Sequence, residues 1–125
     1  MPNRDVVILT DVALVTCIAQ KGAGDALVEA AREAGAQGAT VYFARGSGVR
    51  ERLGLLGLAV EVEKEVLNIV VSTDQVDRMV EALYLKGRLD TPGMGFIYVT
   101  PLEKAATYVP EAILKRLASG EERVR

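Results

Sequence analysis

Residues 35–48 read Gly-Ala-Gln-Gly-Ala-Thr-Val-Tyr-Phe-Ala-Arg-Gly-Ser-Gly, and the organisation of the whole chain can be worked out from them. Gly35 follows a segment whose apolar residues recur at helical spacing, and glycine is the usual left-handed end of a helix. The run from Thr40 to Phe43 is β-branched or aromatic, which is typical of a strand. The stretch therefore predicts a helix, a turn and a strand in that order.

The end of this stretch carries the first candidate binding residues. Arg45, Gly46, Ser47 and Gly48 end the stretch, and Arg50 lies just beyond them. Backbone N–H groups freed by glycine, together with guanidinium groups, are what an anionic ligand needs. A flexible turn that leaves a strand accounts for the same residues without any ligand. The rest of the chain must decide between the two interpretations.

Composition limits the class of protein. With 125 residues, 50% of them hydrophobic and 26% charged, the chain predicts a single globular domain over residues 1–125. A net charge of −2 argues against a nucleic-acid partner, because such proteins concentrate basic side chains on one surface. No apolar run reaches membrane-spanning length, and the N-terminus lacks the layout of a signal peptide. We therefore expect a cytoplasmic protein that does not insert into a membrane.

The chain has no histidine and a single cysteine, Cys17. This excludes Ser–His and Cys–His catalysis and every histidine-ligated metal site, and we predict no metal. Cys17 lies within an apolar segment, so we expect a buried core residue. Glu51, Glu61 and Glu63 could serve a hydrolase, although a solvated strand face explains their alternation with apolar residues as well.

The remaining segments predict two strand–helix–strand units. Strands are expected at residues 13–19, 39–45, 60–71 and 96–99, with a brief edge strand at 6–9 and with Pro101 leaving the sheet. One helix should start near Asp25 and end at Gly35, and a second should start at a Ser72–Gln75 capping box and end at Gly87. A short helix is expected at 111–117, a flexible loop at 46–60, a glycine-rich turn at 90–95 and a mobile tail at 118–125.

This order predicts an α+β domain of the ferredoxin-like βαββαβ class, with a core at residues 13–105. Two right-handed units give a four-stranded antiparallel sheet with both helices on one face. The strands at 13–19, 66–71 and 96–99 are apolar at nearly every position, so the other face of the sheet should be apolar too. A symmetric oligomer is the simplest way to cover that face.

At this point the sequence resembles the PII-type nitrogen-regulatory signalling proteins, as a divergent PII-like member. The resemblance covers residues 13–105. Residues 37–48 are similar to the family's second strand and the base of its T-loop. Residues 93–99 are similar to its B-loop and fourth strand, and residues 101–105 to the start of its C-terminal segment. The resemblance implies a homotrimer with adenine nucleotides bound between subunits. It also implies that loop 46–60 signals to a partner, such as a membrane transporter or an enzyme.

The chain departs from that family at positions that matter for phosphate binding. The resemblance places the family's B-loop lysine at Phe96 and two C-terminal arginines at Thr107 and Val109. Charge-assisted hydrogen bonds are worth about 1.5–3 kcal/mol each, so their loss should weaken binding of a triphosphate. We therefore expect AMP or ADP as the effector rather than ATP. No tyrosine occurs between residues 46 and 60, so the family's uridylylation site is missing.

The sequence thus favours a non-enzymatic signalling protein. A small enzyme on the same fold, such as a nucleotide hydrolase, is the alternative. The predicted ligand-binding residues come from the two glycine-rich segments, the end of the second helix and the C-terminal segment: Arg45, Gly46, Ser47, Gly48, Arg50, Gly87, Gly93, Met94, Gly95, Phe96 and Lys104.

Overall fold

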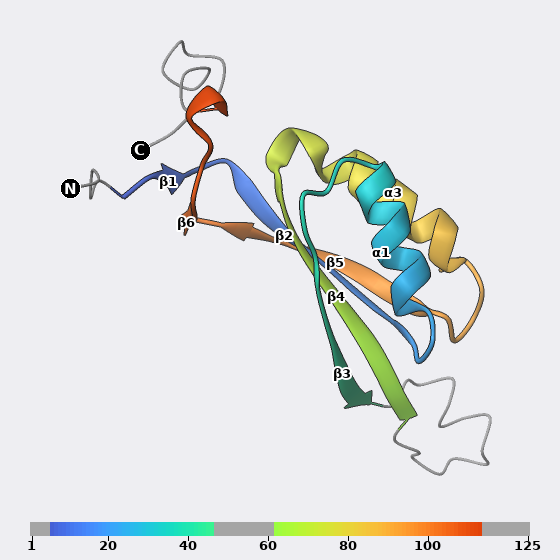
Figure 1. Ribbon diagram of the computed structural model, residues 1–125. Helices are drawn as coiled ribbons and strands as arrows, with labels where there is room; N and C mark the ends of the chain where they lie inside the picture. The colour runs from blue at the N-terminus through green and yellow to red at the C-terminus, as the bar shows by residue number, and fades with distance from the viewer. Residues whose placement is uncertain (1–5, 47–61, 114–125) are drawn as a thin grey trace.

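Four antiparallel strands with two helices on one face form the body of the computed structural model, which describes residues 6–46 and 62–113 (Figure 1). The strands lie in the order β3-β4-β2-β5. Their bounds are Val12–Gln20 for β2, Thr40–Gly46 for β3, Val62–Ser72 for β4 and Gly95–Leu102 for β5. Helix α1 spans Gly24–Glu33 and helix α3 spans Val76–Gly87. The predicted βαββαβ order and ferredoxin-like arrangement are confirmed.

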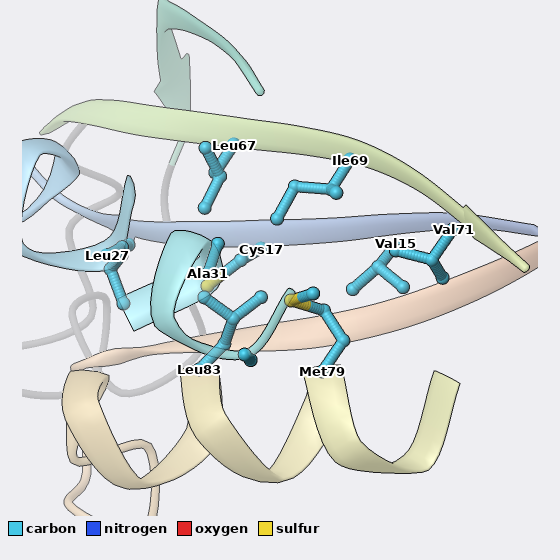
Figure 2. Packing of buried hydrophobic residues seen from close by; sticks show 11 residues of the cluster. Val15, Cys17, Leu27, Ala31, Leu67, Ile69, Val71, Met79 and Leu83 are labelled. Atoms are coloured by element: carbon cyan, nitrogen blue, oxygen red, sulfur yellow. The ribbon is translucent and has the colours of Figure 1, made fainter. Parts of the chain in front are cut away.

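The core lies between this sheet and the two helices. Successive strand residues point to opposite faces, so alternate positions of β2 and β4 reach the helices. Figure 2 shows Met79 and Leu83 of α3 directed at this face of the sheet. The largest fully buried side chains of this core include Cys17, as predicted, and come from both the sheet and the helices: Leu27, Leu67, Ile69, Met79, Leu83, Val15 and Cys17.

The face of the sheet away from the helices, called the open face below, carries many apolar side chains. Val70 is 51% exposed there, Tyr42 46% and Phe96 56%. Each lies one residue away in its strand from a position that points toward the helices. The expectation of a sheet that is apolar on both sides therefore holds in the structure.

A glutamate from another strand caps helix α1. No side chain of the helix's own N-terminal segment forms a capping hydrogen bond. Instead the Glu65 carboxylate, from β4, accepts hydrogen bonds from the Gly22 N–H and, at 3.3 Å, from the Gly24 N–H. Helix N-termini have unpaired N–H groups and a partial positive charge, so a carboxylate stabilises them. At the other end of the helix Gly35 has φ +109°, the left-handed conformation predicted for it.

The predicted capping box at Ser72–Gln75 is wrong. The Ser72 hydroxyl donates to the Asp74 carboxylate at 2.6 Å and caps no backbone N–H. A short acceptor two residues on competes with the backbone for the hydroxyl. Residues Thr73–Gln75 form a 3₁₀ turn, η1, and α3 starts at Val76. At the end of α3 the left-handed residue is Arg88, with φ +54°, so Gly87 still belongs to the helix.

Two predictions about the outer strands also need correction. Pro101 does not leave the sheet, since it lies opposite Ala13 within β5. Proline is tolerated because β5 is an edge strand. The strand expected at 6–9 is β1, Ile8–Leu9, but it pairs with β6, Ala105–Ala106, in a separate two-stranded sheet. Figure 1 shows this small sheet projecting away from the helices.

Other predicted segments lie partly or wholly outside the described residues. Of loop 46–60 only Gly46 is described, and it ends β3. The C-terminal helix is described for residues 111–113, where Ile113 N–H donates to the Pro110 carbonyl at 3.0 Å. The predicted tail at 118–125 lies outside the described residues. Within the described ranges, no helix has the length and apolar character needed to cross a membrane.

Candidate functional site

The described ends of the two glycine-rich segments, Gly46 and the Gly93–Gly95 turn, lie at the same end of the sheet. Strand pairing places Gly95 opposite Ala19 and Gly46 opposite Val62, so the start of β5 and the end of β3 share this end. They occupy opposite edges, however, because β4 and β2 lie between them. Three inter-strand spacings amount to about 14 Å. Within one copy, Gly46 and the Gly93–Gly95 turn are therefore separated by about the width of the sheet.

The turn that leads into β5 is held in a defined shape. Gly93 has φ +83° and Gly95 has φ +133°, a conformation that other L residues rarely adopt. A Cβ atom on Gly95 would lie 2.0 Å from the Ile18 carbonyl oxygen, so no other residue fits there. The Gln20 amide donates to the Gly93 carbonyl at 2.9 Å, and Met94 N–H donates to the Thr91 carbonyl at 3.2 Å. The backbone of this turn is thus preorganised.

Phe96 follows the turn and lies on the open face. Its side chain is 56% exposed, and its ring centroid lies 5.8 Å from that of Tyr98 with a 32° tilt. Tilted rings at this spacing attract each other. Phe96 therefore does not pack into the core. The position that the resemblance assigns to a phosphate-binding lysine instead carries an exposed aromatic ring.

Of the predicted cations that the structure describes, Arg45 and Lys104, neither lies at this turn, and two further cations, Lys86 and Arg88, lie near it in the chain. Arg45 is exposed near the end of β3, on the opposite edge of the sheet. Lys86 and Arg88 are exposed at the end of α3, a few residues before Gly93. Lys104 is exposed but follows the far end of β5, a strand of 8 residues that spans roughly 23 Å. A single chain therefore places Lys104 and the Gly93–Gly95 turn at opposite ends of the sheet.

Three further positions considered from the sequence, Gly87, Thr107 and Val109, lie within the described residues. Gly87 lies in the last turn of α3, where a Cβ atom would come within 3.2 Å of the Leu89 side chain. Val109 is buried, with 8% exposure, whereas Thr107 is exposed. Ser47, Gly48 and Arg50 lie outside the described residues.

The described residues hold little of what hydrolytic or metal chemistry needs. They contain no group of three or more histidine, cysteine, aspartate or glutamate side chains able to hold a metal ion. Burial raises the pKa of the Cys17 thiol to about 11, which leaves it protonated and a poor nucleophile near neutral pH. Glu63, considered above for a hydrolase, pairs with Lys21 at 3.3 Å on the surface.

Three side chains at or near this site were missed from the sequence. Gln20 fastens the turn at Gly93, and Glu65 caps α1 from another strand. Asn68 accepts a hydrogen bond from the buried Thr16 hydroxyl at 2.8 Å. Thr16 and Asn68 interrupt otherwise apolar strands, and that interruption was the available signal, whereas Gln20 ends its strand and Glu65 lies among the charged residues at the start of β4.

Comparison with known proteins supports the fold described above. The family model described as Nitrogen regulatory protein P-II matches residues 12–111. Among solved structures, the chain is similar to Arabidopsis thaliana PII bound to citrate, with 26% sequence identity and a TM-score of 0.60. That match covers 75% of this chain and 79% of the Arabidopsis chain. The family match begins at Val12 and so leaves β1 outside it.

Proposed function

This chain belongs to the nitrogen regulatory protein P-II family, and we propose that it signals by binding AMP or ADP, in preference to ATP, between copies of the chain. The observation that carries this proposal is the pairing of a preorganised glycine turn with an uncharged ring at Phe96. Backbone N–H groups of the turn can donate to one or two phosphates. A longer phosphate chain would lose water without gaining a cation at this position.

Placing the ligand between copies follows from the position of the two edges. The Gly93–Gly95 turn begins one edge strand, and Arg45 and Gly46 end the other. These groups can surround one ligand where the β3 edge of one copy approaches the β5 edge of another. The apolar open face supports the same assembly, because a monomer would leave it in water. We propose the homotrimer that the family resemblance implies.

The signalling step rests on sequence alone. Residues 47–61 lie outside the described part of the chain, and they hold three of the four glycines of loop 46–60. Glycine raises the entropic cost of ordering a loop, so a ligand that orders it changes what a partner can contact. A membrane transporter or an enzyme is the proposed kind of partner. The protein itself is proposed to act without catalysis in the cytoplasm.

Calorimetric titration with AMP, ADP, ATP, a cyclic nucleotide and citrate tests the ligand. We expect AMP or ADP to bind more tightly than ATP. Phe96→Lys should raise ATP affinity by about tenfold or more, one regained charged contact, and should change AMP affinity much less. Leu85→Lys is the matched control, because Leu85 is 66% exposed on α3. ATP as the tightest ligand of the unmodified protein would contradict the proposal, and release of phosphate during titration would favour the hydrolase.

A further inference from the structure

A line of neutral polar side chains crosses the middle of the open face. Strand register places Thr40 opposite Asn68, Asn68 opposite Thr16, and Thr16 opposite Tyr98. Residues in register across a sheet point to the same face. These four residues, one from each strand, are called the polar row below.

Mainly apolar side chains flank the polar row on both sides. Two residues further along the strands toward Gly95, the neighbouring positions are Tyr42, Val66, Ile18 and Phe96. Two residues in the other direction they are Val70, Leu14 and Thr100. The polar row is therefore enclosed by apolar surface. This differs from the usual arrangement, in which polar groups form the rim of a contact surface.

In a single copy the central pair of the row already has one buried member, Thr16, and one half-buried member, Asn68. Thr16 is 2% exposed and donates to the Asn68 side-chain oxygen at 2.8 Å. That bond uses the amide oxygen of Asn68. Within residues 6–46 and 62–113, no hydrogen bond is found for the Asn68 amide N–H groups. Asn68 is half-buried, so its amide N–H groups remain able to donate to a molecule that packs on the open face.

We propose that the polar row fixes the register in which a second copy of this chain packs on the open face. The proposal rests on the assembly proposed above. A second copy suits this face because hydroxyl and amide groups both donate and accept, so one row can satisfy the same row of another copy. Neither the row nor its two flanking rows contains a charged residue, so these three rows of one copy can face those of another without charge repulsion.

The physical reason is a difference in directionality. Hydrophobic burial is non-directional, so apolar rows can slide over one another at little cost. An amide N–H that is buried without an acceptor is costly, so a register that leaves Asn68 unpaired is disfavoured. A single polar residue in a coiled-coil seam selects register and oligomer size in the same way. The polar row therefore lowers the free energy of one packing arrangement of two copies relative to other arrangements that bury a similar apolar area.

Native mass spectrometry of the full-length chain carrying Thr16→Val together with Asn68→Leu tests this role. The unmodified protein should give one assembly size. The double variant should give at least two sizes, with a denaturant midpoint no lower than that of the unmodified protein. Thr100→Val is the matched control, because it also replaces an open-face hydroxyl but lies outside the row, and it should keep a single size.

Each other outcome is decisive. A double variant with one size, the same as the unmodified protein, would overturn the inference. A folded monomeric double variant would also overturn it, because the row would then supply affinity rather than register. If the unmodified protein is monomeric, the proposed assembly itself fails and this inference fails with it. Should circular dichroism show the double variant unfolded, Thr16→Val alone carries the same expectations.

Discussion

Gly95 is the position of the candidate site that tolerates substitution least. Its φ of +133° requires glycine, and so does the Ile18 carbonyl oxygen, which would lie 2.0 Å from any Cβ atom at this position. Gly95→Ala should therefore lower the free energy of unfolding by at least about 3 kcal/mol, measured by urea denaturation. Gly38→Ala is the control, because open space surrounds that Cβ position and its φ is not positive. It should change stability by about 1 kcal/mol or less. Equal effects would mean that the turn is not held as described.

Cys17 gives a second prediction at this scale. Burial raises the pKa of its thiol from 9.0 to about 11. The unfolded chain therefore loses the thiol proton at lower pH than the native protein does. The contribution of this thiol to the free energy of unfolding is fully present below pH 9 and is lost as the pH rises toward 11. In the folded protein a thiol reagent should react slowly at pH 8 and rapidly after urea unfolding. Fast reaction of the native protein would show that Cys17 is accessible.

At the scale of single elements, the start of helix α1 depends on a neighbouring strand. Glu65 of β4 accepts from two backbone N–H groups, at Gly22 and Gly24, and its removal leaves both without that partner. Glu65→Ala should destabilise the fold by about 1–3 kcal/mol in thermal or urea unfolding. The same change at Glu63, two residues earlier, removes only an exposed ion pair with Lys21. That control should cost less than about 1 kcal/mol, and a larger loss at Glu63 than at Glu65 would contradict the capping role.

Element type and order could be predicted because local patterns carry them. Thr40 to Phe43 is strand chemistry, and β3 forms there. Gly35 ends α1 in the left-handed conformation. The Ser72 cap could not be settled in this way, because Asp74 offers the hydroxyl a second partner two residues away. Local sequence does not show which of two nearby hydrogen-bond partners a side chain will take.

The missed features are contacts between distant residues. Glu65 and Gly24 are 41 residues apart, and Gln20 and Gly93 are 73 apart. The strand pair Ile8–Leu9 with Ala105–Ala106 is too short to show any alternation of its own. For the site, the sequence predicted the glycine turn that leads into β5, and the structure has it there. The exchange of a lysine for Phe96 stays a prediction from the resemblance. That Lys104 lies at the far end of β5 became visible only with the strand register.

At the scale of the whole molecule, the fold follows the family, whereas two positions of the candidate site differ from what the resemblance implies. The strand order and core follow the ferredoxin-like pattern, and the family match spans residues 12–111. The exposed ring of Phe96 and the buried side chain of Val109 stand where the resemblance puts cations. A core is constrained by packing on every side, whereas a binding position is constrained only by its ligand. This contrast supports the proposal, made above, of the same architecture with a different ligand preference.

The last prediction concerns assembly through the open face. Val70 is 51% exposed on that face, and its neighbour Ile69 is 1% exposed in the core. Val70→Asp should leave the fold intact, because the side chain already reaches water in a single copy. It should nevertheless break the assembly, since packing another copy on the face would bury an unpaired carboxylate. Light scattering should then report a mass near 13.4 kDa in place of a multiple of it.

The control for that experiment is Leu85→Asp. Leu85 is more exposed, at 66%, but lies on α3, which covers the opposite face of the sheet (Figure 1). Both variants add one negative charge at an exposed apolar position, so a general effect of charge or solubility would change them equally. Only Val70→Asp should give monomers if the open face is where copies meet. Monomers from Leu85→Asp alone would move the interface to the helices, and an intact assembly in both variants would remove the open face from it.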